Sequence, residues 1–537
     1  MAWDLGPAIP IRNEVHFGDR VMRCFADRAP HTYGIFAAAL ARHPDNEALV
    51  AGDTRLTYRQ LAAESDRVAA GLVATGIQAG DRVALLLGNR IEFVTTLLAC
   101  LRIGAICVPL GTRLQTPEIA YILDHAGAVL LVHEADLADR LPTASDVPKL
   151  RGQYAAGNDC TGSKPFSSLT QASTIPDIAS PAEEDTAVIL YTSGTTGRPK
   201  GAMLAHINIV HSALHFQYCM GLTPADRSLL AVPASHVTGL VAIIIAAWQG
   251  GGGVIMVPEF KARDFLPLAA KERLTHTIMV PAMYNLCLLQ PDFDKHDLSS
   301  WRVGGYGGAP MPQATITALA QKLPQLGLVN AYGATETTSP TTIMPPEKSA
   351  SHSDSVGLEA PCAEVIVVDS EGREVPRGET GEIWIRGPMV VPGYWENPEA
   401  TAREFTAGFW HSGDIGSIDA DGFVRVFDRV KDMINRGGYK VFSVEVENVL
   451  SHHPGVLESA IIAKPCPVLG ERVHAFVARK DGAVTESQLK DFCAGRLADY
   501  KVPETFTLLD EPLPRNANGK LLKRVLRERL PPGASGA

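Results

Sequence analysis

Residues 190–204 read LYTSGTTGRPKGAML and place hydroxyl side chains, two glycines and a lysine where an apolar strand gives way to a loop. The glycines allow the backbone to turn so that its N–H groups converge on an anion, and the hydroxyls and a mobile lysine add further donors. The stretch therefore predicts a phosphate-binding loop with ATP as the candidate ligand. The residues of this predicted loop are Thr192, Ser193, Gly194, Thr195, Thr196, Gly197 and Lys200.

The spacing of this loop is not that of a Walker A motif. No G-x-x-x-x-G-K-[ST] string occurs in the chain, and Lys200 is followed by Gly201 and Ala202. A GTPase or a P-loop kinase is therefore disfavoured. A surface turn rich in glycine, serine and threonine is the competing interpretation of the loop.

Composition and charge limit the class of protein. The chain has 537 residues, 46% hydrophobic and 20% charged, so it can bury a large core and is expected to form two or more domains. Its formal net charge of −10 disfavours nucleic acid as a partner, because backbone phosphates need a basic face. The nine cysteines lie far apart without a C-x-x-C pair, which fits a reducing cytoplasm better than a disulfide framework or a zinc site.

Targeting and membrane signals are missing from the sequence. The first twenty residues contain no apolar core followed by a cleavage site, and the chain ends in Ser-Gly-Ala rather than in a retention or lipidation motif. The longest apolar run, residues 240–248, is about half as long as a bilayer span. We expect a cytoplasmic protein without an integral membrane segment, and a homodimer is left open.

Strand-like and helix-like segments alternate along the chain. Residues 48–51 and 82–87 are apolar runs expected as buried strands, and residues 58–72 and 91–101 have helical spacing. This alternation predicts an α/β body built on parallel sheets. Residues 365–388 instead contain two β-rich runs joined by an acidic turn, which predicts a small antiparallel element.

Two glycine-containing motifs follow the phosphate loop, GYGGAP at residues 305–310 and NAYGATET at residues 330–337. The glycines of the first would let a flat ring or an acyl chain approach the backbone closely. In the second, Tyr332 would stack on a purine, Thr335 would contact a phosphate, and Glu336 supplies the hard oxygen ligand that Mg²⁺ prefers. The candidate cofactor-binding residues are Gly308, Ala309, Pro310, Ala331, Tyr332 and Gly333.

Three further motifs occur later in the chain. WHSGDIG at residues 410–416 places Asp414 in a turn as a bidentate acceptor for ribose hydroxyls, and DRVKD at residues 428–432 supplies Arg429 as a second ribose or phosphate partner. PRNANGK at residues 514–520 carries Lys520 on a turn, from which it would swing toward a reacting phosphate. An ordinary surface lysine is the competing interpretation of Lys520.

Together these motifs resemble the adenylate-forming superfamily of acyl-CoA synthetases, nonribosomal peptide adenylation domains and firefly luciferases, over about residues 36–523. Each motif alone is a moderate signal, but their joint occurrence in this order is specific. The resemblance implies a large N-terminal domain, residues 1–430, of two α/β subdomains plus a small β-barrel. It also implies a small mobile α+β C-terminal domain, residues 431–537, hinged at Lys431.

The resemblance further implies an acyl-CoA ligase that uses ATP, Mg²⁺ and coenzyme A. An ionised carboxylate would attack the α-phosphate of ATP and release pyrophosphate, and no general base is required because the acid is already ionised at pH 7. Glu336 would hold Mg²⁺ and Lys520 would stabilise charge at the reacting centre. Thr335 and His236 complete the implied catalytic set.

In the second step a thiol attacks the acyl-adenylate. In the resembled family the C-terminal domain rotates about its hinge, removes the late lysine and brings a glycine-containing loop to the pantetheine tunnel. Here that loop is NRGGYK, residues 435–440, in which Gly437 and Gly438 would let the thiol arm approach closely. Arg436 and Lys440 are candidate contacts for the phosphates of coenzyme A, and a solvated basic turn is the competing interpretation.

The acyl pocket of the resembled family begins near residues 233–240, PASHVTGL in this chain. Amino-acid-activating members carry an aspartate there, whereas this chain has Ser235 and His236, so an amino acid is disfavoured; Ser235 also replaces the usual aromatic residue. A mostly apolar lining without a fixed cation disfavours a dicarboxylate and favours a medium- to long-chain fatty acid or similar hydrophobic acid, with an aryl or alicyclic acid as the alternative. The implied lining residues are His236, Val237, Thr238, Tyr306, Gly307 and Thr338.

Three other functions are weighed against coenzyme A ligation. The acyl group would pass to a carrier protein or an amine in the first, although no carrier domain adjoins the motifs. The second is a luciferase-like oxidation, which no residue of the sequence favours. The third is a catalytically silent nucleotide-binding protein, and the intact Glu336, Asp414 and Lys520 count against it.

Overall fold

The computed structural model describes residues 3, 9–172, 180–192, 198–480, 484–515 and 521–530 of the chain. Residues 193–197 of the predicted phosphate loop and the predicted catalytic Lys520 lie outside the described residues. The boundary and hinge expected at Lys431 stay a prediction. The chain forms two compact units, one of Met1–Val365 with Ile385–His411 and one of Ile366–Trp384 with Ser412–Ala537.

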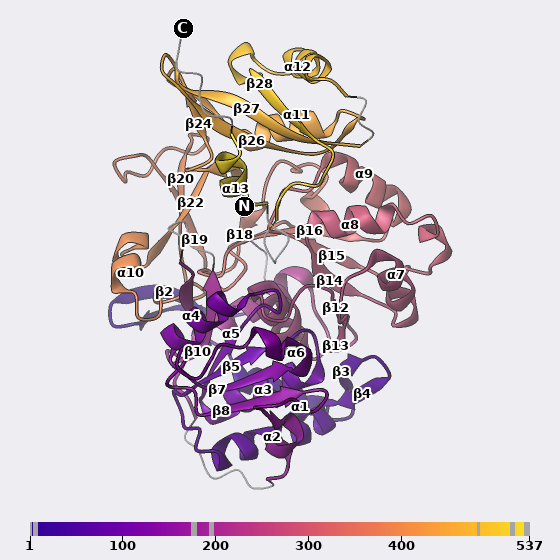
Figure 1. The fold of residues 1–537 in the computed structure, drawn as a ribbon, viewed down its shortest axis with the longest axis vertical. Helices are drawn as coiled ribbons and strands as arrows, with labels where there is room; N and C mark the ends of the chain where they lie inside the picture. The colour runs from indigo at the N-terminus through magenta and orange to yellow at the C-terminus, as the bar shows by residue number, and fades with distance from the viewer. Residues whose placement is uncertain are drawn as a thin grey trace. The chain divides into compact units, whose positions relative to one another are not determined.

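A seven-stranded sheet lies in the early part of the first unit (Figure 1). Its strands are β5 (Arg82–Leu86), β6 (Ile106–Pro109), β7 (Ala128–Glu134), β8 (Gly152–Ala156), β9 (Lys164–Pro165), β10 (Thr186–Thr192) and β11 (Lys200–Ala205). Their order is β11-β10-β6-β5-β7-β8-β9, and β5 pairs in parallel with both β6 and β7. β5 and β7 are buried along nearly their whole length, as expected of parallel strands covered on both faces.

A nine-stranded sheet lies in the same unit. Its strands are β3 (Glu47–Ala51), β4 (Thr54–Thr57), β12 (Arg227–Leu230), β13 (Gly253–Met256), β14 (His276–Met279), β15 (Val303–Tyr306), β16 (Gly327–Tyr332), β17 (Thr342–Ile343) and β18 (Leu358–Glu359). Their order is β18-β17-β16-β15-β14-β12-β13-β3-β4. The pairs from β3 through β13, β12, β14 and β15 to β16 are all parallel, which confirms the predicted α/β body.

Helices join and cover these strands. They are α1 (Thr32–Arg42), α2 (Tyr58–Ala74), α3 (Ile91–Ile103), α4 (Thr116–Ala126), α5 (His206–Met220), the π-helix η3 (Thr238–Ile245), α6 (Ala246–Gly250), α7 (Ala262–Lys271), α8 (Pro281–Leu288), α9 (Gln313–Lys322) and α10 (Pro398–Glu404). Thr57 and Gln60 begin α2 with a capping box, in which each side chain accepts a hydrogen bond from the other residue's backbone N–H, at 3.2 and 2.9 Å. The apolar run at residues 240–248 forms η3 and the start of α6, both buried.

Each sheet of the first unit has its own apolar core. Ile119, Ile122 and Leu123 of α4 pack onto β5, β6 and β7. Helices α7, α8 and α9 pack against the nine-stranded sheet, where Trp301 is 1% exposed and stacks on Tyr284 with ring centroids 5.9 Å apart. A separate hairpin of β1 (Ile11–His16) and β2 (Arg20–Phe25) precedes α1. The burial of both faces leaves the ends of the strands as the exposed parts of these sheets.

The second unit contains a sheet with helices, which confirms the expected small α+β part. Its elements are β24 (Ile434–Arg436), β25 (Tyr439–Val441), α11 (Ser443–Ser451), β26 (Val456–Cys466), β27 (Gly470–Arg479), α12 (Glu486–Ala494), β28 (Thr505–Leu509) and α13 (Lys523–Glu528). The strand order is β25-β24-β27-β26, with β28 parallel to β27. Val446 and Leu450 of α11 and Leu489 of α12 are fully buried against this sheet.

A further five-stranded sheet contains the two β-rich runs predicted within residues 365–388. Its strands are β19 (Glu364–Val368), β20 (Gly381–Arg386), β21 (Phe405–Thr406), β22 (Phe409–Ile418) and β23 (Val424–Arg429). The order is β19-β20-β22-β21, and β23 pairs antiparallel with β22. The division into two units falls inside β19, β20 and β22. Over the part of the chain that the structure describes, no helix combines the length and the apolar character needed to cross a membrane.

Four of the buried histidines of the first unit have strongly lowered pKa values. Burial lowers the pKa of three of them, on α5, to about 3 and that of the fourth, on β14, to about 4. They are His206, His211, His215 and His276. At His211 the backbone fixes the neutral form, because Nδ1 donates to the carbonyl of Ile207 at 2.9 Å and Nε2 accepts the N–H of Phe25 at 3.2 Å.

We predict that acid destabilises the first unit through these histidines. In the unfolded chain they titrate near pH 6.5 and bind protons that the folded chain excludes, so stability is complete above that pH and is lost as the pH falls toward the lower folded pKa. Each histidine should remove about 2 kcal/mol of unfolding free energy by pH 5. Urea denaturation at a series of pH values measures the effect. His211→Gln should flatten the curve, and replacement of the exposed His452 should not.

Candidate active site

Three of the predicted motifs meet at one edge of the nine-stranded sheet. The loop with His236 follows β12, the loop of residues 307–310 follows β15, and the loop of residues 333–338 follows β16. β12, β14, β15 and β16 are neighbours and run parallel, so their carboxyl ends lie at the same edge. Ligands of open α/β sheets bind at this edge. The structure therefore brings together residues that are about one hundred positions apart in sequence.

The loops after β15 and β16 approach each other at backbone distance. A Cβ atom at Gly307 would lie 2.4 Å from the carbonyl oxygen of Ala331, so only glycine fits there. Gly308 has a φ of +76°, which also favours glycine. Gly308, Ala309 and Pro310 are exposed. The local geometry agrees with the close backbone approach that the sequence predicts, and the binding role of these residues stays a prediction.

The implied acid-binding residues differ in burial. Val237, Tyr306 and Thr338 are buried, at 4%, 2% and 0% exposure, whereas His236 and Thr238 are half-buried. Tyr306 belongs to the apolar core under helices α7 to α9, and its burial raises the pKa of its hydroxyl to about 12. The structure thus places Tyr306 in packed core, and its role as a lining residue stays a prediction.

Backbone strain lies next to the predicted metal ligand. Thr338 and Ser339 have φ values of +51° and +41°, which are uncommon for residues other than glycine and especially for a β-branched one. The Thr338 hydroxyl is buried and has no hydrogen-bond partner among the described residues. Strain of this kind tends to occur at functional sites.

Asn89 holds the start of the His236 loop, and sequence reasoning missed it. Its Nδ2 donates to the carbonyls of Val232 and Val257 at 3.0 and 2.9 Å, and its Oδ1 accepts the N–H of Ala234 at 2.7 Å. Asn89 follows β5 of the other sheet and is 8% exposed. One side chain therefore fixes the chain after both β12 and β13, and a lone asparagine after a strand gives no sequence signal for this.

Thr335 and the predicted metal ligand Glu336 are both buried, at 9% and 8% exposure. Oε1 of Glu336 lies 2.9 Å from the Tyr394 hydroxyl and 3.5 Å from the hydroxyl of Thr192, the last residue of β10. The first contact is a good hydrogen bond and the second is long. Thr192, from the flank of the predicted phosphate loop, is thus brought to Glu336 from the other sheet.

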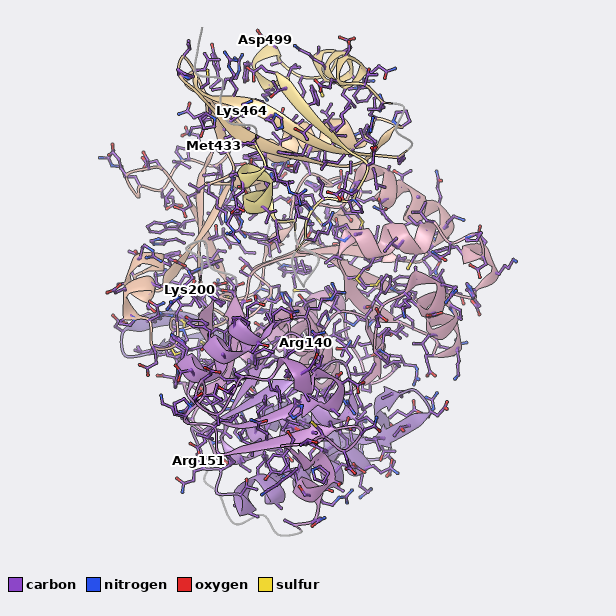
Figure 2. All side chains as sticks on the ribbon, in the orientation of Figure 1. Arg140, Arg151, Lys200, Met433, Lys464 and Asp499 are labelled. Atoms are coloured by element: carbon purple, nitrogen blue, oxygen red, sulfur yellow. The ribbon has the colours of Figure 1, made fainter. Side chains whose placement is uncertain are left out.

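Lys200 lies on the other flank of that loop and pairs in register with Thr192. Its Nζ lies 2.6 and 2.5 Å from the two oxygens of Glu404, the last residue of α10, and the side chain is 7% exposed. Lys200 is one of the side chains labelled in Figure 2. The sequence predicts a mobile charge here, whereas the structure holds the amine in a buried ion pair. Contact between Lys200 and phosphate stays a prediction.

Asp414 and Arg429, predicted as ribose partners, come together in the second unit. They face each other across the β22–β23 pair, and Nε of Arg429 lies 2.7 Å from Oδ1 of Asp414. Asp414 is 5% exposed, and its backbone N–H donates to the Ser412 hydroxyl at 3.0 Å. The pair is preformed, since the guanidinium already orients the carboxylate.

The implied hinge and thiol-arm loop lie in the same unit. Lys431 is exposed, and its carbonyl accepts a hydrogen bond from Arg527 at 3.3 Å. Gly437 and Gly438 have φ values of +59° and +91° in the turn between β24 and β25, so both positions favour glycine. Arg436 is committed to an ion pair with Glu504 at 2.7 Å. The turn has the geometry for a close approach, and its role stays a prediction.

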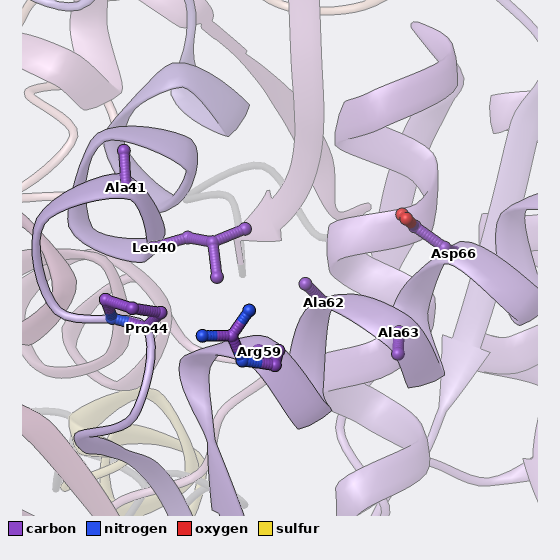
Figure 3. A pocket seen from close by; sticks show the side chains of 7 residues that line it. All are labelled: Leu40, Ala41, Pro44, Arg59, Ala62, Ala63 and Asp66. Atoms are coloured by element: carbon purple, nitrogen blue, oxygen red, sulfur yellow. The ribbon is translucent and has the colours of Figure 1, made fainter.

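A cavity of about 480 Å³ lies elsewhere in the first unit (Figure 3). It is formed by α1, α2 and the chain between them, and no residue of the predicted motifs lines it. Its lining residues are Leu40, Ala41, Pro44, Arg59, Ala62, Ala63 and Asp66. The cavity is therefore separate from the candidate active site.

Comparison with known proteins shows the family and the fold that the chain shares with solved and curated relatives. The sequence profile of the AMP-binding enzyme family matches residues 36–395, and that of the AMP-binding enzyme C-terminal domain matches residues 445–520. The chain is 36% identical over 488 residues to a feruloyl-CoA synthase of Amycolatopsis sp, covering 91% of this chain and 96% of the relative. It is also 36% identical over 480 residues to the long-chain-fatty-acid–CoA ligase FadD13 of Mycobacterium tuberculosis, covering 89% and 93%. The solved structure of o-succinylbenzoate coenzyme A synthetase MenE from Bacillus subtilis, in complex with ATP and magnesium ion, superposes with a TM-score of 0.82 at 30% identity, covering 92% of this chain and 99% of that chain.

We predict that Asn89→Ala weakens both the fold and the predicted acid-binding loop. The change removes the partners of a buried N–H and of buried carbonyls, and each orphaned group costs about 1 to 3 kcal/mol. Urea denaturation should show a loss of at least about 2 kcal/mol, and the KM for the acid should rise more than the KM for ATP. Asn158→Ala, at an exposed position, is the matched control. Wild-type stability of Asn89→Ala would contradict the role assigned to Asn89.

Proposed function

The chain belongs to the AMP-binding enzyme family, and we propose that it joins a hydrophobic carboxylic acid to coenzyme A through an acyl-adenylate. Within this family it is an AMP-forming acid–thiol ligase that uses ATP, Mg²⁺ and coenzyme A. What is proposed is the class of acid and the part that each residue plays.

One observation carries the assignment of residues. The loops that contain His236, Gly307 and Glu336 leave parallel strands of one sheet at a single edge. A nucleotide and an acid bound there would contact residues of all three loops. The close approach of the Gly307 backbone to Ala331 supports the binding of a flat ring against these two loops.

The side chains at this edge fit a magnesium ion. Glu336 offers a buried carboxylate, and among the described residues hydrogen bonds reach its Oε1 alone, which leaves Oε2 for a hard cation. Glu336 would hold the ion, with the Thr335 hydroxyl beside it in sequence for a phosphate. A bound Mg²⁺ would neutralise the phosphates and lower the repulsion that an attacking carboxylate meets.

In the first step an oxygen of the ionised acid bonds to the α-phosphorus of ATP while the bond from that phosphorus to the pyrophosphate oxygen breaks. The products are acyl-AMP and pyrophosphate, and no proton is transferred. We assign Lys520 to the charge that develops at the reacting phosphate, and Asp414 with Arg429 to the ribose. The preformed pair of Asp414 and Arg429 supports the second assignment.

In the second step the sulfur of coenzyme A attacks the acyl carbon as a thiolate, and AMP leaves with the electron pair of the broken acyl–oxygen bond. We assign Gly437 and Gly438 to the approach of the thiol arm. Rotation about Lys431, which would exchange Lys520 for this loop, is part of the proposal.

The acid is proposed to be a medium- to long-chain fatty acid or a similarly hydrophobic acid. The buried Val237 and the apolar π-helix η3 beside His236 support this class, because an apolar wall favours an apolar tail. An aryl acid is the second candidate. It is favoured by the feruloyl-CoA synthase relative, whose identity to this chain equals that of the fatty-acid ligase relative.

A cytoplasmic location and a homodimer also belong to the proposal. The widely spaced cysteines support the cytoplasm, and all nine are free thiols. Light scattering of the purified chain would test the dimer.

We predict that the full-length protein forms one class of acyl-CoA from a mixed panel of acids. The panel contains fatty, aryl, alicyclic and dicarboxylic acids with ATP and Mg²⁺, with and without coenzyme A, and mass spectrometry identifies the products. Acyl-CoA from fatty acids is the expected result. Acyl-AMP without acyl-CoA would instead indicate a carrier protein or an amine as the acceptor, and no product from any acid would contradict the proposal.

We predict that Lys520→Ala lowers adenylate formation by about 100- to 1,000-fold, because a charge aimed at the transition state is lost. Thioester formation from supplied acyl-adenylate should stay near the wild-type rate, since the lysine is absent from the second step. Pyrophosphate exchange and thioester assays measure the two steps separately. Lys480→Ala, at an exposed position of the same unit, is the control. Equal loss of both steps would rule out this division of roles.

A further inference from the structure

A buried chain of polar side chains runs behind Glu336. The Tyr394 hydroxyl lies 2.9 Å from Oε1 of Glu336 and 2.7 Å from Oε2 of Glu404, and Lys200 donates to both oxygens of Glu404. These residues come from separate parts of the first unit, Lys200 from β11 and Glu404 from α10. The proposed reaction gives no task to Tyr394 or Glu404.

The ring of Tyr394 is fixed in place. Its side chain is 2% exposed, and its backbone N–H donates to the Thr401 hydroxyl at 3.0 Å. Phe405 packs edge-on against the ring with centroids 5.7 Å apart, and Nζ of Lys200 lies 4.4 Å from the ring centroid. The hydroxyl therefore cannot leave the space between the two carboxylates without moving packed neighbours.

A phenol carries one hydrogen and can donate it to one carboxylate at a time. At neutral pH a tyrosine hydroxyl is protonated, so Tyr394 is a donor to whichever carboxylate its hydrogen faces. The direction of its hydrogen depends on which carboxylate carries the less neutralised charge.

Glu404 is the neutralised carboxylate. Burial acts to raise its pKa, but the opposing hydrogen bonds, led by those from Lys200 and Arg403, hold the pKa below its usual value. Arg403 adds a second cation, 2.9 Å from Oε1. Glu336 has no ion pair within the described ranges of the chain. The tyrosine hydrogen is therefore drawn toward Glu336.

We infer that Tyr394 is a positioning residue for the metal ligand Glu336. Its hydroxyl holds Oε1 and leaves Oε2 for the cation, while Lys200, acting through Glu404, keeps the hydrogen directed at Glu336. The inference rests on the proposed function, which makes Glu336 the metal ligand. It also means that Lys200 acts on the metal ligand through Glu404 and Tyr394.

The test is calorimetric binding of the manganese complex of α,β-methylene-ATP, and of the metal-free analogue, to the full-length protein. The ratio of the two affinities isolates the contribution of the metal ion. Tyr394→Phe should lower this ratio about tenfold, as expected for loss of a hydrogen bond to a metal-ligating carboxylate. Tyr58→Phe removes another fully buried hydroxyl, which donates to the Gly252 carbonyl at 2.6 Å, and should leave the ratio unchanged.

Glu336→Gln separates failure of this inference from failure of the proposed function. If Glu336→Gln leaves the ratio unchanged, Glu336 is not the metal ligand and both fall. If Glu336→Gln lowers the ratio and Tyr394→Phe does not, only the positioning role is overturned.

A double-mutant cycle tests the part of Lys200. Lys200→Met should lower the ratio in the same direction as Tyr394→Phe, and the double variant should be no worse than Tyr394→Phe alone. Lys200→Arg retains a cation for Glu404 and should keep the ratio within about twofold of wild type. Additive losses, or an equal loss of affinity for both forms of the nucleotide, would show that Lys200 acts on phosphate directly and would overturn the relay.

Discussion

The parallel pairing of β12, β14, β15 and β16 is the constraint on which the rest of the first unit depends. Parallel strands with both faces buried can expose their polar backbone only at their ends, and crossover helices return each strand in the same direction. Three loops that are distant in sequence come to share one space because the strands before them share one direction.

Much of the architecture could be predicted from the sequence, because it is encoded locally. The apolar runs at β3 and β5 and the helical spacing of α2 and α3 appear within windows of a few residues. The motifs around Glu336 and Asp414 could also be found, because glycines and charged residues stand out in short strings. The α/β class then implies that ligands bind near the carboxyl ends of the parallel strands.

The contacts that hold the site could not be predicted in the same way. Asn89 acts on a loop about 145 residues later, and Tyr394 meets Glu336 across 58 residues. Each is a single polar residue without a periodic pattern, so only the folded chain reveals its partner. For Lys200 the sequence prediction differs from the structure. The motif predicts a mobile cation, but Lys200 is held by Glu404, which lies on a helix outside the motif. Side chains that orient other side chains are therefore the hardest to predict from sequence.

The division of the chain into units has a consequence for synthesis. Residues 366–384 belong to the second unit but precede residues 385–411, which belong to the first. Domains emerge from the ribosome in chain order and fold as units when their residues are available. The first unit therefore lacks its last segment, with Tyr394 and Glu404, until part of the second has already been made. The buried chain of polar side chains behind Glu336 is consequently completed late, after the strands of both large sheets have left the ribosome.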